Sequence, residues 1–191
     1  MKMRRALLLL LPLLVGGCGL FSHTPSRFYS LDPVRPASVT EIRGLPIGLD
    51  VVELPPGMDR KEVVVRKAGH ELEIRGTDQW TATLQPLILH TLGADLASRM
   101  PENMSILPGQ AKPVAPMRSL DIMIEELAPG PDRAVTMDVR WTLRTPGMAD
   151  FSRREHIVAE IGSLDSVNVA GGLSSALGTL ADRIVAELPK Q

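Results

Sequence analysis

The sequence VTMDVRWTLR, residues 135–144, alternates apolar and polar side chains without a break. Successive side chains of a β-strand point to opposite faces of a sheet, so this period of two predicts a strand with one buried and one solvated face. The residues expected to point into the core are Val135, Met137, Val139, Trp141 and Leu143. Asp138, Arg140 and Arg144 are among the outward residues, which predicts a charged face on the open side of the sheet.

Further strands are predicted on both sides of this stretch, where alternating or continuous apolar runs end at Gly or Pro. They cover residues 27–31, 45–54, 62–66, 70–74, 104–107, 120–125 and 151–161. Ile47, Leu49 and Val51 occupy alternate positions of their run and are expected to share its inward face. The turn sequence Lys67-Ala68-Gly69 joins two of these runs, which predicts a β-hairpin.

Two helices are predicted, over residues 83–100 and 166–188, because leucine and isoleucine recur there every three to four residues. The first half of the second helix is rich in Gly, Ala and Ser, and we expect close packing against the sheet to offset the low helix propensity of its glycines. The predicted fold class is α+β. It is a two-layer sandwich in which a mainly antiparallel sheet carries two long helices on one face.

The composition excludes several classes of protein. Aromatic residues make up 3% of the 191 residues and the net charge is −1, which argues against a nucleic-acid-binding surface. A single cysteine excludes an internal disulfide framework and a multi-cysteine zinc site. The hydrophobic content of 44% is enough for a packed core.

The amino terminus has the pattern of a bacterial lipoprotein signal peptide. Lys2, Arg4 and Arg5 precede a ten-residue apolar run that is too short to span a bilayer, and the lone cysteine, Cys18, follows a pair of glycines. We therefore predict a signal peptide over 1–17, cleavage after Gly17, and diacylglyceryl and N-acyl chains on Cys18. Residues 18–26 then form the acylated tether, and residues 27–191 form one α+β domain. The eight residues from Gly19 to Ser26 reach at most about 28 Å, so the domain is expected to lie close to its membrane.

No residue pattern indicates catalysis, a cofactor or a metal centre. The sequence lacks a GxSxG, P-loop, GxGxxG or HExxH motif, and the spacing of its four histidines does not suggest a shared metal ion. We therefore predict a protein that is not an enzyme and that binds no cofactor apart from the acyl chains.

Five residues are candidates for contact with a protein partner. Asp59 and Arg60 lie in a charged turn before an apolar strand, and the alternative for them is a solvated turn. Arg140 and Arg144, with Asp138, Arg153 and Arg154, are expected to form a mixed-charge patch on the open sheet face, where the alternative is a solvated surface. Trp80 precedes the first helix and is expected either to pack at the helix start or to lie at a subunit contact.

Taken together, these features resemble the ABC-type transport auxiliary lipoprotein family. The resemblance is carried by Arg27-Phe28-Tyr29-Ser30-Leu31 soon after the cysteine, by IGLDVVELPPGMDRKEVVVR at residues 47–66, by Trp80 and Leu84 before the long helix, and by the order of the later elements. The sequence Asp78-Gln79-Trp80-Thr81-Ala82 departs from the acidic-proline pair that often follows the tryptophan in the family.

The resemblance implies a non-enzymatic auxiliary component of a transporter with an ATPase, a permease and an MCE-type protein, which moves phospholipids or other hydrophobic molecules between the inner and outer membranes. Gly19 after the cysteine resembles an outer-membrane sorting signal, which implies anchoring to the periplasmic side of the outer membrane. A homo-oligomer is left open. The alternative function is a stand-alone periplasmic lipid-binding lipoprotein with an apolar groove between helices and sheet.

Overall fold

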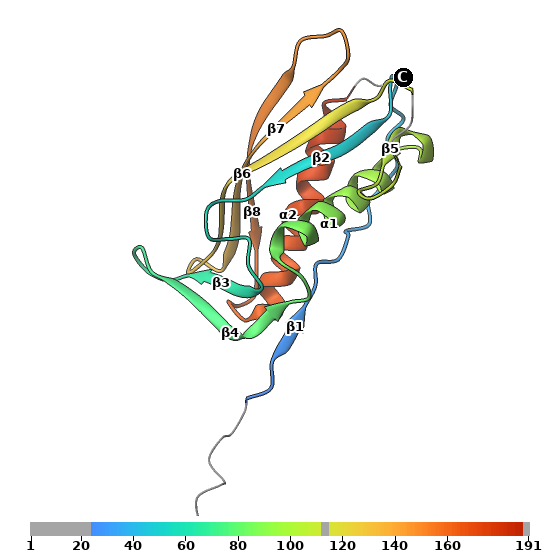
Figure 1. Ribbon diagram of the computed structural model, residues 1–191. Coiled ribbons are helices and arrows are strands. Elements are labelled where there is room, and N and C mark those ends of the chain that lie inside the picture. The colour runs from blue at the N-terminus through green and yellow to red at the C-terminus, as the bar shows by residue number, and fades with distance from the viewer. Residues whose placement is uncertain (1–23, 112–114, 189–191) are drawn as a thin grey trace, which may run out of the picture.

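A computed structural model describes residues 24–111 and 115–188 of the chain (Figure 1). The described residues form two β-sheets and two long helices. The elements in chain order are β1 (Arg27–Tyr29), β2 (Ile47–Glu53), β3 (Glu62–Arg66), β4 (Leu72–Trp80), α1 (Leu84–Arg99), the short 3₁₀ helix η2 (Glu102–Met104), β5 (Ser105–Ile106), β6 (Arg118–Gly130), β7 (Ala134–Arg144), β8 (Phe151–Glu160) and α2 (Ser166–Ala186).

The larger sheet has five strands in the order β5-β2-β6-β7-β8. Strands β6, β7 and β8 form an antiparallel meander, while β2 runs parallel to both β5 and β6. The apolar face predicted for β7 is buried, because all five of its inward residues are at most 7% exposed. This strand therefore lies between β6 and β8 in the sheet and contributes five side chains to the core.

The smaller sheet has three strands in the order β1-β4-β3. Strands β3 and β4 form the predicted hairpin, and β4 continues to Trp80, beyond the strand predicted over residues 70–74. The reason is a second partner: the last three residues of β4 pair in parallel with Arg27–Tyr29 of β1. A pairing across some fifty residues of sequence leaves no periodic trace in the residues that make it.

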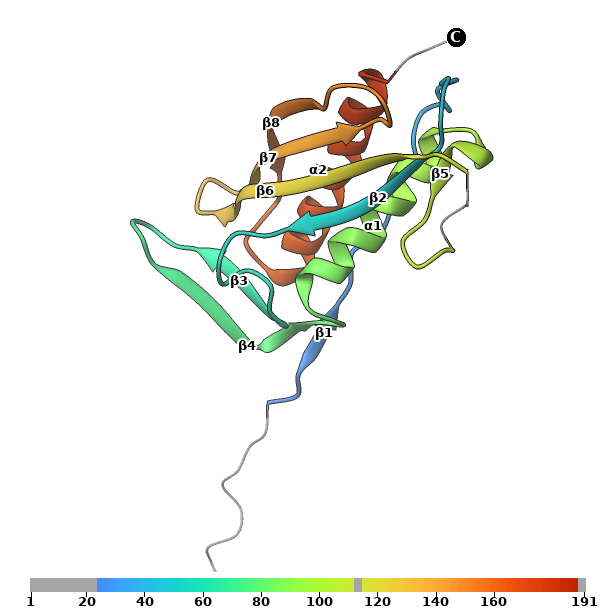
Figure 2. The same ribbon diagram turned by 45° about the horizontal axis from the view of Figure 1, so that its top comes forward.

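Both helices lie on one face of the five-stranded sheet (Figures 1 and 2). Helix α2 packs against β7 and β8, α1 packs against β2, and the two helices contact each other. The apolar stripes predicted for both helices are buried, including Ile88 and Leu92 of α1 and Leu177 and Leu180 of α2, all at 0% exposure. The α+β class, the mainly antiparallel sheet and the helices on one face are confirmed.

Two details of the prediction are wrong. The strands form two sheets with three parallel pairings, β1 with β4, β2 with β5 and β2 with β6, in place of one sheet. The register of β2 against β6 shifts between Leu49 and Val51, so Val51 is 40% exposed and Val52 takes the inward position. A β-bulge adds one residue to a strand and thereby reverses which face the following side chains occupy.

Within the described ranges, neither helix combines the length and the apolar character needed to cross a bilayer.

Candidate functional site

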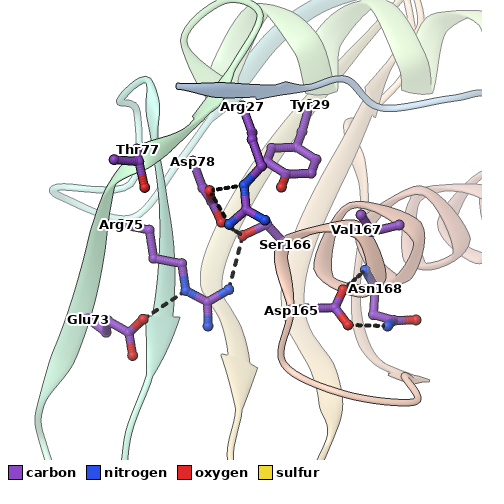
Figure 3. Close-up of a pocket in the computed structure, with 10 residues that line it drawn as sticks. All are labelled: Arg27, Tyr29, Glu73, Arg75, Thr77, Asp78, Asp165, Ser166, Val167 and Asn168. Carbon is purple, nitrogen blue, oxygen red and sulfur yellow. Dashed lines mark hydrogen bonds and ion pairs between the residues drawn. The ribbon is translucent and has the colours of Figure 1, made fainter. Parts of the chain in front are cut away.

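A polar cleft lies where β1 and β4 meet the amino-terminal end of α2, and it encloses about 640 Å³ (Figure 3). In Figure 3, β4 lies on one side of it, the first turn of α2 on the other, and β1 crosses above. The residues that line it are Arg27, Tyr29, Glu73, Arg75, Thr77, Asp78, Asp165, Ser166, Val167 and Asn168.

Asp78 is the central carboxylate of this cleft and is only 4% exposed. The parallel register of β1 and β4 places Arg27 beside it, and Arg27 donates from Nε and Nη2 to Asp78 Oδ1 at 2.9 and 2.8 Å. The hydroxyl of Ser166 donates to Asp78 Oδ2 at 2.6 Å. Burial by itself raises the pKa of Asp78, but the Ser166 and Arg27 hydrogen bonds outweigh burial and leave the pKa below its usual value. Asp78 is therefore ionised at neutral pH.

Arg75 connects this carboxylate to the outer part of the cleft. It donates from Nη1 to Ser166 Oγ at 3.0 Å and from Nε to Glu73 Oε1 at 2.8 Å. Lys67 also pairs with Glu73, and the hydrogen bonds from Lys67 and Arg75 lower the pKa of Glu73. The strands and α2 are thus joined by a chain of charged groups that satisfy one another.

Asp165 caps the amino terminus of α2, as the Ser-x-Asp-Ser sequence before the helix favours. Its carboxylate accepts from the Asn168 backbone N–H at 2.8 Å and from Asn168 Nδ2 at 2.7 Å. The Ser163 hydroxyl and these Asn168 donors lower the pKa of Asp165 to about 2. Asp165 therefore holds the first turn of α2 in place beside the cleft.

The cleft is built as a clamp between the small sheet and α2. Among the residues that line the cleft, Ser166 is the one whose hydroxyl contacts a carboxylate, that of Asp78. Because the pKa of Asp78 is lowered, its carboxylate is a weak base and is poorly suited to activate the Ser166 hydroxyl as a nucleophile. No group of three or more metal-ligating side chains occurs among the residues that the structure describes. The arrangement supports mechanical attachment of the small sheet to the helical layer.

The open face of the five-stranded sheet carries two of the candidate partner residues. Arg140 donates to Glu125 Oε1 at 2.7 Å, and Arg144 pairs with Asp121 and with Asp150. Arg154 reaches the same Glu125 oxygen at 3.3 Å. This face is therefore a compensated charge network in which both arginine side chains stay more than 40% exposed.

Arg153 does not belong to this face, contrary to the sequence prediction. It stands opposite Trp141 in the β7–β8 pairing and lies over the Phe151 ring at 4.2 Å. Neighbouring residues of a strand point to opposite faces, so Arg153 and Arg154 cannot share one. Arg153 pairs instead with Glu187 at the end of α2.

The other three candidate partner residues gather near the start of α1. Asp59 Oδ1 accepts from the backbone N–H of Gln85 at 3.0 Å, and Arg60 pairs with Glu62 at 3.2 Å. The backbone N–H of Trp80 bonds to Lys61 at 2.6 Å, and Trp80 is 3% exposed. Trp80 thus packs at the helix start, the first of its two alternatives, and offers little ring surface to a partner. The five candidates lie in two separate places, and Gly17 and Cys18 lie outside the described residues.

A second buried charge network was missed by the sequence analysis. Asp95 and Arg99 of α1 are 0% and 2% exposed. Arg99 donates to Asp95 Oδ1 at 3.2 Å and to Asp182 of α2 at 2.6 Å, while the backbone N–H of Val34 donates to Asp95 at 2.7 Å. The network joins the segment after β1 to both helices. Its sequence signal is a charged pair, four residues apart, that continues the apolar stripe of α1.

The described residues define an α+β fold of two sheets and two long helices, and comparison with known proteins identifies the family. Residues 29–185 match the model of the ABC-type transport auxiliary lipoprotein component. The chain belongs to this family, so the resemblance seen in the sequence is confirmed. Family membership places the protein among membrane-anchored periplasmic lipoproteins of bacteria that assist ABC-type transport.

Two solved structures share the fold. One is a crystal structure of an uncharacterized protein, with a TM-score of 0.68 and 17% identity over 86% of this chain and 99% of that one. The other is a Xanthomonas campestris protein of the DUF330 family, with a TM-score of 0.64 and 13% identity over 83% of this chain and 92% of that one. No protein with a curated description matches the chain.

Proposed function

We propose that this protein is an outer-membrane lipoprotein, acylated on Cys18, that serves as a non-enzymatic docking component of an ABC transporter with an MCE-type periplasmic protein. The transporter would move phospholipids or other hydrophobic molecules between the inner and outer membranes. The observation that carries the proposal is the family match over residues 29–185, which covers nearly the whole folded domain. The family description supplies auxiliary transport, and the MCE partner and the outer membrane are the proposed specifics.

The arrangement of the two ends supports a receptor role. Figure 1 shows β1, which follows the tether in sequence, at one end of the molecule and the carboxyl-terminal end of α2 at the other. An acyl anchor on Cys18 would therefore hold the β1 end toward the membrane and present the far end and the sheet face to the periplasm. The charged groups of the cleft in Figure 3 are engaged with one another, which suits a structural role better than turnover of a substrate.

The alternative function, a lipid carrier with an apolar groove between helices and sheet, requires a cavity large enough for an acyl chain. The apolar cavity at that level, lined by Trp80, Leu84 and Leu173 among others, encloses about 10 Å³. That volume is about one water molecule, far below the volume of an acyl chain.

The docking proposal assigns contact with the partner to the open sheet face, through Arg140 and Arg144. Charges of this kind guide encounter and register more than they add affinity. The full-length lipoprotein is purified in mild detergent after cross-linking in cells, and an MCE-type protein is expected among the linked partners. The double change Arg140→Glu and Arg144→Glu should reduce its recovery severalfold.

The matched control is Arg183→Glu, which replaces an equally exposed arginine that pairs with Glu155 and reaches the sheet from α2. Recovery of the MCE-type protein should be unchanged in this variant. Absence of an MCE-type partner from an abundant preparation would contradict the proposed function. Equal loss in both variants would contradict only the assigned face. Sedimentation of the same preparation would show whether the receptor is a homo-oligomer.

A further inference from the structure

A second cavity, of about 420 Å³, lies at the end of the molecule opposite β1. It is formed by the segment before β2, the β7–β8 connection and the last turn of α2. Its walls are mainly apolar and include Leu45, Leu143, Met148 and Phe151. The volume lies within the range of about 300–1,000 Å³ that is common for small-molecule sites.

One cation in this wall is buried. Arg118 is 3% exposed, and its guanidinium donates from Nε to the Leu45 carbonyl at 2.7 Å and from Nη2 to the Arg43 carbonyl at 3.3 Å. Both acceptors are neutral, and no carboxylate of residues 24–111 or 115–188 lies within ion-pair distance of Arg118. Burial lowers the pKa of Arg118, because desolvation disfavours the charged guanidinium.

The charge balance of the cavity favours an anion. Arg43 is exposed and adds a second positive charge to the lining. Glu187 also lines the cavity, but its carboxylate is paired with Arg153 at 3.6 Å. A hydrogen-bonded anion would recover part of the desolvation cost of Arg118, since charge-assisted bonds of a guanidinium are the strongest available to it.

The walls favour a chain of methylene groups over a peptide. A peptide segment brings backbone amides and carbonyls that must be hydrogen-bonded when buried. Among the side chains that line the cavity, Thr145 is the one uncharged polar group. An alkyl chain needs no such partners and gains from each methylene group that leaves water.

We propose that this cavity binds a single-chain anionic amphiphile, with its acidic headgroup at Arg118 and Arg43 and its alkyl chain along Leu45, Leu143, Met148 and Phe151. The inference adds a ligand to the protein itself and does not depend on the docking partner. A lipid could thus be held at the end farthest from the tether.

The test uses calorimetric titration of the mature chain carrying Cys18→Ala, which removes the need for detergent. The probes are dodecanoate below its micelle concentration, dodecanol, which lacks the charge, and acetate, which lacks the chain. Dodecanoate should bind with one-to-one stoichiometry, at least tenfold more tightly than either control. Binding of acetate as tight as that of dodecanoate, or of dodecanol as tight, would overturn the proposed ligand class.

Two methionine variants locate the site without touching the buried arginine. Met148 is 71% exposed and lines the cavity, so Met148→Asp should weaken dodecanoate binding at least tenfold with little effect on folding. Met123 is 44% exposed on the open face, away from the cavity, so Met123→Asp should bind as the parent does. Arg118→Gln should also abolish binding, provided that its circular dichroism spectrum matches the parent.

Three results would overturn the assignment. The first is the absence of saturable dodecanoate binding, and the second is equal binding by the two methionine variants. The third is an oligomer of the parent protein that is lost in Met148→Asp and kept in Met123→Asp. The last result would show that a second copy of the chain fills the cavity. Co-purification of an MCE-type protein could succeed or fail independently of all three.

Discussion

At the scale of single residues, two adjacent glycines of α2 have opposite surroundings. A Cβ atom added at Gly172 would lie 2.5 Å from Ile161 Cγ2 and 2.7 Å from Val135 Cγ2, whereas one added at Gly171 would meet nothing within 4 Å. The close approach of helix and sheet that the sequence predicted is therefore made at Gly172. Gly171 contributes only its low helix propensity.

We expect Gly172→Ala to lower the free energy of unfolding by about 1–3 kcal/mol, because the methyl group must displace branched side chains of the core. Gly171→Ala is the matched control and should raise it by up to about 1 kcal/mol through helix propensity. Urea denaturation of both variants measures the difference. Similar effects of the two changes would contradict the close contact.

Asp95 gives the protein a pH dependence. Burial raises the pKa of Asp95 from 3.8 to about 6, although the Val34 N–H and Arg99 act in the opposite direction. The unfolded chain therefore releases this proton at lower pH than the folded protein does. The Asp95 contribution to stability is fully present below about pH 4 and is lost as the pH rises to about 6, a change of up to about 3 kcal/mol.

Asp95→Asn should remove this dependence. The free energy of unfolding of the parent minus that of the variant is expected to fall between about pH 4 and pH 6 and to stay constant above pH 7. Urea denaturation at pH 4, 5, 6 and 7 measures it. A difference that rises with pH would show instead that the pair with Arg99 governs the titration.

At the scale of elements, α1 begins with a cap from elsewhere in the chain. Thr83 occupies the N-cap position without a side-chain cap bond, and Asp59, from the turn before β3, accepts the Gln85 N–H. The charged turn that the sequence analysis named as a candidate for partner contact, with a solvated turn as the alternative, thus also stabilises a helix terminus. An anion there also interacts favourably with the helix dipole.

Asp59→Ala is expected to lower the free energy of unfolding by about 1 kcal/mol, the usual value of a lost cap. Thr83→Ala, which removes no cap bond, should change it by a few tenths at most. Thermal unfolding followed by circular dichroism compares the two variants. A larger loss for Thr83→Ala would show that the local residue is the effective cap.

At the scale of the whole molecule, three separate sets of contacts hold the amino-terminal segment to the rest of the domain. They are the β1–β4 pairing, the Arg27–Asp78–Ser166 contacts and the bond from Val34 to Asp95. Any pull on an anchor attached before β1 would be transmitted to the small sheet and to both helices.

If the proposed acylation of Cys18 holds the protein at the outer membrane, replacing Cys18 with Ala should release it, either as a soluble periplasmic species or retained at the inner membrane with its signal peptide, because the proposed acyl chains would be lost. Ser22→Ala, in the same tether, is the control and should fractionate with the parent. Immunoblots of separated membranes measure this. Normal outer-membrane recovery of the cysteine variant would contradict the anchor.

The sequence by itself determined which segments form strands and helices and, apart from Val51 in β2 and Arg153 in β8, which of their faces are buried, because periodicity is a local property of the chain. It also indicated the family, through motifs spread over most of the mature chain. Only the tertiary structure decided the parallel pairings of β1 and β2, the bulge that exposes Val51, and the pairing of Asp78 with Arg27 and Ser166. These features depend on contacts between residues that are far apart in sequence or on a register shift between two strands. Neither kind of contact changes the local pattern of apolar and polar residues from which the elements were predicted.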